Sequence, residues 1–285
     1  NGAFKAGFEN AAPQWRGMTT DIPTTRRRVE MHWLGKVPMI REWLGDKHVG
    51  GLDNFVHSLD HKKYETTISL DRHDLEDYEG AEEAIVSNAM IARQMGEEAA
   101  MHPDRQIFSI LNAGSALTYD GVALFSDSHK VNTSSSTTFS NQVTGGSSDR
   151  FYLAVTKRAV KPFFRVVREE LHTVQHITME SDRNFMAREL LWGVEGRIGY
   201  HPGMWQLLAR SDEAITEDSV DELVDKFAAF TDEKGDPLNL MPDTIIVGKS
   251  QRAAAEKLFD VSELATGGTN RMYRRFNVVF SPRLP

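Results

Sequence analysis

Residues 71–103 read DRHDLEDYEGAEEAIVSNAMIARQMGEEAAMHP and carry the strongest periodic signal in the 285-residue chain. This spacing of small and apolar residues is typical of one face of a helix. It predicts a helix from about residue 77 to residue 102 that stops before Pro103, because proline cannot continue helical hydrogen bonding. At about 1.5 Å per residue, such a helix would be roughly 35–40 Å long. The residues that form the face are Ala81, Ala84, Ile85, Ile91, Ala92, Met95 and Ala99.

Acidic residues gather at the predicted start of this helix. A carboxylate cluster is one way to bind a metal ion, but acids at a helix N-terminus also complement the helix dipole, and Asp74 or Asp77 can cap the first turn. The capping interpretation is favoured over a metal site. The acids are Asp71, Asp74, Glu76, Asp77, Glu79, Glu82 and Glu83.

Upstream of the helix, two segments lack a core of their own. Residues 1 to about 30 have no helical or strand period and predict an extended arm that becomes ordered by lying on another surface. Residues 43–72 predict a long β-hairpin: KYETTISL alternates as a half-buried strand, residues 55–59 are its expected partner, and residues 60–63 form the turn. An isolated hairpin is marginally stable at best, so we expect it to rest on another surface, such as a neighbouring subunit.

Downstream, the predicted elements alternate between helix, loop and strand. A short helix in DRQIFSILNAG should end at Gly114, and the Ser-, Thr-, Asn- and Gly-rich residues 131–149 predict an exposed loop. Residues 161–180 and 187–209 are expected to contain strands. EDSVDELVDKFAAF (residues 217–230) predicts an amphipathic helix, and DTIIVGKSQRAAAEKLF (residues 243–259) predicts a strand, a turn and a helix.

The composition is that of an ordinary globular protein, with 40% apolar and 26% charged residues. The chain has no cysteine, which excludes disulfides and thiolate chemistry. No apolar run is long enough to span a membrane and no leader is expected. The formal net charge of −8 limits any nucleic-acid contact to local basic clusters: Arg26, Arg27 and Arg28, or Arg271, Arg274 and Arg275. An intersubunit or solvated face is the preferred interpretation of both.

The triplet Gly248-Lys249-Ser250 follows a predicted strand and precedes a helix, as in a nucleotide-binding P-loop. The P-loop motif also needs a glycine five residues before Gly248, where this chain has Asp243. A tight turn between strand and helix explains Gly248 better.

Two further motifs imitate catalytic or metal sites. His172 and His176 in HTVQH have a metalloprotease spacing, but they lack its glutamate and lie in a predicted strand, which would separate them by roughly 13 Å. SDSHK (residues 126–130) places Ser, Asp and His side by side, whereas catalytic triads converge from distant segments, so a surface turn is expected. No catalytic residue, cofactor site or metal site is predicted, and the protein is not expected to be an enzyme.

A family resemblance rests on several motifs taken in order. The sequence from about residue 33 onward resembles the major capsid proteins of Mu-type tailed phages; each motif is weak alone, but their shared order and spacing are specific. The motifs are WLGKVPMIREWLGDK, YETTISLDRHDLEDYEG, HPDRQIFSILNAG, DGVALFSDSHK, KRAVKPFFRVVREE and GYHPGMWQLLARS.

The resemblance implies an α+β fold, the tailed-phage capsid fold of the Hong Kong phage type. It implies an N-terminal arm (residues 1–40), an E-loop hairpin (41–73), a peripheral or P domain (74–210) with the spine helix 77–102 and the exposed loop 131–149, and an axial or A domain (211–285). FMARELLWGVEGRIGY (residues 185–200) resembles closing P-domain strands yet precedes the A-like segment, so permuted connectivity is expected. Some relatives cross-link Lys to Asn; Lys62 and Lys63 lie near the predicted hairpin tip, but no asparagine partner is evident and no cross-link is predicted.

The function implied is a major capsid protein that self-assembles as hexamers and pentamers into an icosahedral, virion-enclosing head around double-stranded DNA, built in the bacterial cytoplasm. Implied partners are copies of the chain, scaffold and portal proteins, a cement or decoration protein, and packaged DNA in non-specific contact; no membrane is implied. Two alternatives remain: an encapsulin-like compartment shell and an α/β nucleotide-binding enzyme.

Overall fold

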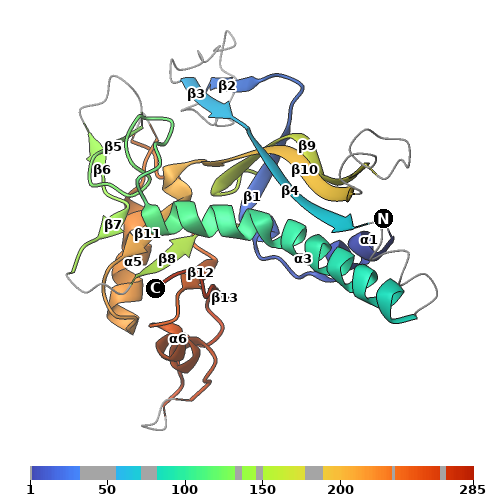
Figure 1. Cartoon of the computed structure of the whole chain (residues 1–285). Helices are drawn as coiled ribbons and strands as arrows, with labels where there is room; N and C mark the ends of the chain where they lie inside the picture. The colour runs from blue at the N-terminus through green and yellow to red at the C-terminus, as the bar shows by residue number, and fades with distance from the viewer. Residues whose placement is uncertain are drawn as a thin grey trace, which may run out of the picture.

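The computed structural model describes residues 2–32, 56–71, 82–131, 137–145, 150–176, 189–232, 235–263 and 268–285. Among these residues, strands form a four-stranded sheet, a five-stranded sheet and two two-stranded ribbons. The long helix α3 (Glu82–Ala113) runs from one end of the molecule, beside α1, to the five-stranded sheet at the other (Figure 1). The fold is therefore α+β.

The four-stranded sheet has the order β1-β9-β10-β4. β1 runs parallel to β9, and the other pairs are antiparallel. The alternating KYETTISL segment forms β4, as predicted, and the two 14-residue strands β9 and β10 form the centre. The bounds are β1 (Thr19–Pro23), β4 (Lys62–Asp71), β9 (Phe163–His176) and β10 (Glu189–Pro202).

The five-stranded sheet has the order β13-β12-β8-β11-β7 and holds the main core with the helices α5 and α6. The helix and the strand–turn–helix predicted in the last third are confirmed as α5, β12 and α6. Thr216 caps α5 by accepting from the Ser219 backbone N–H at 3.1 Å. The bounds are β7 (Gln142–Val143), β8 (Phe151–Ala154), β11 (Leu208–Ser211), α5 (Glu217–Ala229), β12 (Thr244–Val247), α6 (Arg252–Phe259) and β13 (Asn277–Phe280).

The predicted hairpin between residues 55–59 and 64–70 is wrong. β3 (Val56–Asp60) pairs with β2 (Arg28–His32), and β4 pairs with β10. Alternation identifies a strand but not its partner, and the polar residues 60–63 contain no tight turn, so nonlocal pairing decides the register. Lys62 and Lys63 consequently lie inside a sheet and not at a hairpin tip. Residues 41–55 and 72–73 of the predicted E-loop lie outside the described residues.

The predicted helix break before Pro103 is also wrong. α3 continues through Pro103 to Ala113 and ends at Gly114, which has φ +63°. An internal proline costs about 3 kcal/mol, but both flanking turns are anchored, so packing overrides the local preference. Ala100 is buried before it, and Asp104 after it accepts from the backbone N–H of Trp15 at 2.7 Å. The predicted start at residue 77 lies outside the described residues.

The N-terminal segment is more structured than the extended arm predicted. Residues 2–10 form helix α1 (Gly2–Asn10), a 3₁₀ turn covers Trp15–Gly17, and β1 joins the main sheet. α1 packs on α3 with Phe4 buried between them. The segment does gain order from another surface, but that surface belongs to the same chain.

The predicted exposed loop 131–149 contains buried structure. β6 (Thr138–Phe139) pairs with β5 (His129–Lys130), and β7 joins the five-stranded sheet. The fully buried Asn141 amide donates to the Leu124 carbonyl at 2.8 Å. A polar composition suggested an exposed loop, whereas these polar groups are satisfied inside the fold. Residues 132–136 and 146–149 lie outside the described part of the chain.

Candidate assembly surfaces

The β2–β3 ribbon stands away from the four-stranded sheet (Figure 1). Its strands join residues 33–55, and His32 and Val56 are paired at that end. At the other end, the Arg28 guanidinium donates to both carboxylate oxygens of Asp60, at 2.7 and 3.2 Å. This bidentate pair lies across the last rung and stabilises the register of the ribbon.

Two histidines fix the ribbon to β10. His57 donates through Nε2 to the Pro202 carbonyl at 3.3 Å, and His201 donates through Nε2 to the Asp60 carbonyl at 2.6 Å. Burial lowers the pKa of both imidazoles. Gly199 permits the contact, because a Cβ there would lie 2.0 Å from the Asp60 carbonyl oxygen. The base of the ribbon is therefore held in a fixed position against β10.

A cleft of about 750 Å³ lies at the foot of this ribbon. Among the described residues, its lining combines cations from β2, β4, β9 and β10 with a single carboxylate, and we call it the basic cleft. Lys63 and Arg197 occupy directly paired positions of β4 and β10. The cations are Arg27, Arg28, Lys63, Arg168 and Arg197, and Asp60 and His61 complete the lining.

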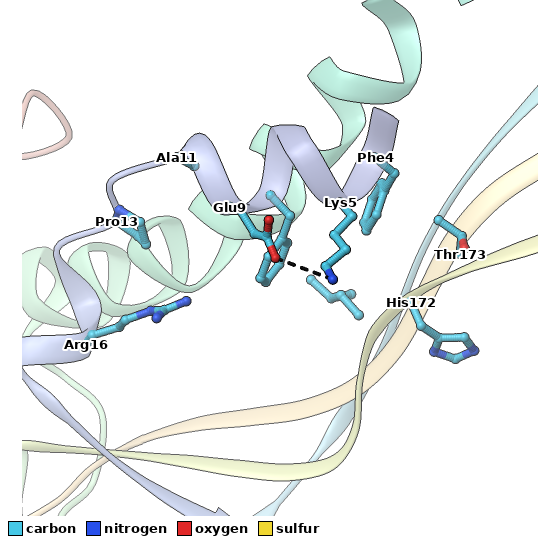
Figure 2. Close-up of a pocket in the computed structure, with 10 residues that line it drawn as sticks. Phe4, Lys5, Glu9, Ala11, Pro13, Arg16, His172 and Thr173 are labelled. Atoms are coloured by element: carbon cyan, nitrogen blue, oxygen red, sulfur yellow. Dashed lines mark ion pairs between the residues drawn. The ribbon is translucent and has the colours of Figure 1, made fainter. Parts of the chain in front are cut away.

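A second surface, the α1 groove, lies between α1 and β9 and has a volume of about 800 Å³. Figure 2 shows Phe4 and Lys5 on α1 facing the strand that carries His172 and Thr173. Phe4 and Phe8 stack at 6.3 Å between ring centroids. Charged side chains border this apolar floor, including the exposed Lys5–Glu9 pair at 3.7 Å.

A third surface, the α3 groove of about 560 Å³, separates α3 from β4. Tyr64 and Met95 line it, and Ile91 and its neighbour Met90 are exposed, Met90 by 62%. His102 lies at one end, where its ring meets Tyr64 at 4.3 Å. Burial, assisted by nearby arginines, lowers the pKa of His102 to about 4. Partly exposed apolar side chains in such a groove suit contact with another polypeptide.

The Gly248-Lys249-Ser250 turn does not form a phosphate site. The C-terminal segment covers it: a Cβ on Gly248 would lie 1.8 Å from the Pro285 carbonyl oxygen. Asp243, at the position where a P-loop needs glycine, instead accepts backbone hydrogen bonds from Thr156 and Lys157 at 2.8 and 3.0 Å. Burial would raise the pKa of Asp243, but these bonds and those from threonine hydroxyls lower it overall. The expected turn between β12 and α6 is present at residues 249–251, and the close backbone approach adds the reason why residue 248 is a glycine.

The HTVQH histidines lie in β9, as expected. His172 lies with Glu169 and Glu195 in a group whose potential ligand atoms are within 4.8 Å of one another. The group is partly exposed, and the Glu169 carboxylate is also 3.4 Å from Arg197 Nε. Glu169 is thus already engaged by a cation, and His176, the second histidine of HTVQH, is not a member of the group.

SDSHK is not the surface turn predicted. His129 is fully buried, stacks on Trp205 at 4.5 Å, and donates through Nδ1 to Asp120 at 2.8 Å. Ser126 and Ser128 instead contact each other at the surface. The histidine is structural, and the three residues do not converge as a triad.

The two arginine clusters have different surroundings. Arg271 and Arg275 both bind Asp221 of α5, at 2.8 and 2.6 Å, so they stabilise their own subunit. Arg27 and Arg28 line the basic cleft. From the sequence, only the arginine triplet 26–28 indicated a basic surface here. Lys63, Arg168 and Arg197 come from separate strands, so no local pattern connects them. The acidic residues 72–81 lie outside the described part of the chain.

The family model described as Mu-like prophage major head subunit gpT matches residues 1–284. The chain belongs to this family. The major capsid protein of Escherichia phage Mu is 30% identical over 292 residues, covering 99% of this chain and 94% of the relative. The Mu-like prophage FluMu major head subunit of Haemophilus influenzae is 24% identical, covering 96% and 91%.

Solved structures agree with the family assignment. A chain from the procapsid of bacteriophage JBD30 matches with a TM-score of 0.84 and 27% identity, covering 99% of this chain and 97% of that one. The bacteriophage JBD30 capsid matches with a TM-score of 0.79 and 20% identity, covering 96% and 92%. A third match is the JBD30 capsid decorated with minor capsid protein trimers, with a TM-score of 0.76, 19% identity, and coverage of 97% and 92%.

This head subunit is a major capsid protein of a Mu-like phage head and a component of the virion. The family is one of capsid structural proteins, and the chain is not an enzyme. That assignment decides against the compartment-shell and nucleotide-binding alternatives. Within the described residues, no helix is long and apolar enough to cross a membrane.

Proposed function

We propose that this head subunit assembles as hexamers and pentamers into an icosahedral shell around the double-stranded DNA genome of a tailed phage. The observation that carries the proposal is the β2–β3 ribbon, which leaves the sheet at a joint fixed by His57, His201 and Gly199. A ribbon held in this way can present the connecting residues 33–55 to a neighbouring subunit. The α1 and α3 grooves add partly apolar surfaces for such contacts.

Within this proposal the chain has the domains of the Hong Kong phage-type fold. The four-stranded sheet with α1 and α3 corresponds to the P domain, and the five-stranded sheet with α5 and α6 to the A domain. Because β7 and β8 belong to the five-stranded sheet, we extend the A domain beyond residues 211–285 to include them. The E-loop corresponds to the β2–β3 ribbon with residues 33–55.

The permuted connectivity is part of the same proposal. Strands β9 and β10 of the four-stranded sheet follow β8 and precede β11, β12 and β13 of the other sheet. The closing P-domain strands would therefore come before most of the A domain, with β7 and β8 left ahead of them.

The proposed partners follow from the same role. Copies of the chain form the shell, a scaffold protein directs assembly, a portal protein occupies one vertex, and packaged DNA is contacted without sequence preference. The JBD30 capsid is decorated with minor capsid protein trimers, which supports a cement or decoration partner here. Assembly would take place in the bacterial cytoplasm.

The proposal is tested by shortening the ribbon. Residues 33–55 are replaced with Asn-Gly, which joins His32 to Val56 by a two-residue turn suited to a paired antiparallel end. The variant subunit should keep the wild-type circular dichroism spectrum and thermal transition. With a scaffold protein present, electron microscopy should show closed shells for the wild type and none for the variant.

A second variant separates length from side-chain contacts: residues 33–55 are replaced by a Gly-Ser linker of equal length. This variant should also fail to form shells, because it lacks the side chains proposed to contact the neighbouring subunit. Normal closed shells from the Asn-Gly variant would contradict the proposal.

A further inference from the structure

The basic cleft holds more positive charge than its surroundings neutralise. Arg28 is paired with Asp60, and Arg197 lies 3.4 Å from Glu169. Among the described residues, no ion pair is formed by Arg27, Lys63 or Arg168, which are exposed. The cleft therefore has capacity for additional anionic groups.

The sheet itself places like charges together in this cleft. Lys63 of β4 is directly opposite Arg197 of β10, and like charges at opposed positions destabilise a strand pair. Next to them, both ring nitrogens of His61 are buried without a hydrogen-bond partner. A carboxylate-bearing segment in the cleft would relieve the repulsion and offer an acceptor to the His61 N–H.

The opposite charge lies at the other end of the same strand. The acidic run (residues 71–83) has seven carboxylates and one arginine, Arg72. Asp71 follows Lys63 by eight residues along β4, which is roughly 26 Å at about 3.3 Å per residue. Figure 1 shows β4 running from the foot of the ribbon toward α1.

The run is bracketed by the end of β4 at Asp71 and by the start of α3 at Glu82, and both of these ends lie away from the foot of the ribbon (Figure 1). The acidic run and the basic cleft are opposite in charge, so they can pair between two copies of the chain. Repeated head to tail, such a contact closes into a ring when the rotation between subunits allows it. Rings are the unit that a shell of hexamers and pentamers needs.

We propose that the basic cleft of one subunit binds the acidic run of a neighbouring copy. The inference rests on the proposed shell assembly and names one of its contacts. DNA phosphate is the rival occupant, but the chain has a net charge of −8 and carries its own concentrated anionic segment. A second copy is favoured because every copy of the chain has one acidic run and one basic cleft, so each cleft in an assembly can be matched by one run.

The test is a charge exchange. The cleft variant Lys63→Glu/Arg168→Glu and the acidic-run variant Asp74→Lys/Asp77→Lys/Glu79→Lys are each expected to lower the yield of closed shells roughly tenfold or more. Combining both sets in one chain should restore assembly. Lys249→Glu, an exposed cation away from the cleft, is the matched control and should assemble normally.

The design separates folding from assembly. Lys63→Glu places an acid opposite Arg197, so the thermal transition of the unassembled subunit should not fall. A cleft variant that assembles like the wild type, or a combined variant without rescue, overturns the inference. If the wild type itself forms no shells, it is the proposed function that fails.

A final arm addresses DNA. Binding of a fluorescent 30-base-pair duplex to unassembled subunits is measured by anisotropy at low salt. Equal weak binding by wild type and cleft variant is expected. Loss of duplex binding with unchanged assembly would assign the cleft to DNA and overturn the inference.

Discussion

At Gly248, a single missing side chain decides whether two chain segments can meet. A Cβ at this position would lie 1.8 Å from the Pro285 carbonyl oxygen, and the obstacle is backbone. Gly248→Ala should therefore lower the free energy of unfolding of the unassembled subunit by about 1–3 kcal/mol. Urea denaturation measures this loss.

The control for this substitution is Gly268→Ala, because an added Cβ there meets nothing within 4 Å. It should change stability by less than about 0.5 kcal/mol. Equal stability of the two alanine variants would contradict the backbone explanation of Gly248.

His102 makes the stability of the subunit depend on pH. Its pKa in the folded subunit is lowered to about 4 from 6.5, chiefly by burial. As the pH falls below 6.5, the unfolded chain gains a proton that the folded subunit resists until about pH 4. The associated stability is complete above pH 6.5 and is lost between pH 6.5 and 4, by about 1–2 kcal/mol after allowance for solvent screening.

The variant His102→Phe keeps an aromatic ring beside Tyr64 but removes this titration. Urea denaturation at pH 7.5 and pH 4.5 should show a smaller stability loss for the variant than for the wild type. His57 and His201, whose pKa values are also lowered, contribute to both proteins and cancel in the comparison. An identical loss in both proteins would contradict the assignment.

At the scale of elements, the contact between α1 and α3 depends on two glycines. A Cβ on Gly7 would lie 2.0 Å from the Arg93 carbonyl oxygen, and one on Gly96 would lie 2.1 Å from that of Phe4. Alanine usually stabilises a helix interior relative to glycine. Here the helices cross so closely that the opposite sign is expected.

Gly96→Ala should therefore destabilise the subunit by about 1–3 kcal/mol and expose α1 to protease. Gly2→Ala, also in α1 but with nothing within 4 Å of an added Cβ, should leave stability and cleavage unchanged. Limited proteolysis with denaturation measures both. A stabilising Gly96→Ala would show that the two helices do not hold each other as described.

The helices and strands differ in how far the local sequence predicts them. Alternation in residues 64–70 and amphipathic spacing in residues 217–230 are local signals, and β4 and α5 form there. Partner choice is not local: β4 pairs with β10, more than a hundred residues away. The helix end predicted at Pro103 was wrong for the same reason, because the buried turns on either side of this proline hold α3 together.

The candidate assembly surfaces were less predictable than the fold class. The basic cleft joins cations from four strands, so no continuous stretch of the sequence predicts it. α1 is only nine residues long and owes its helix to contact with α3. The family resemblance, which depends on motif order along the whole chain, indicated the fold and function more reliably than any single motif.

The whole molecule carries several surfaces that other copies of the chain can complete. A ribbon that leaves the sheet, grooves beside α1 and α3, and charge separated along β4 are all explained by association with copies of the chain. Because part of that association is electrostatic, assembly should weaken as ionic strength rises from about 0.05 to 0.5 M.

The most direct measurement is electron microscopy with light scattering on the wild-type chain, with and without a scaffold protein. We expect closed shells, or rings of hexamer and pentamer size, that become fewer at high salt. A monomer under every condition would contradict this expectation.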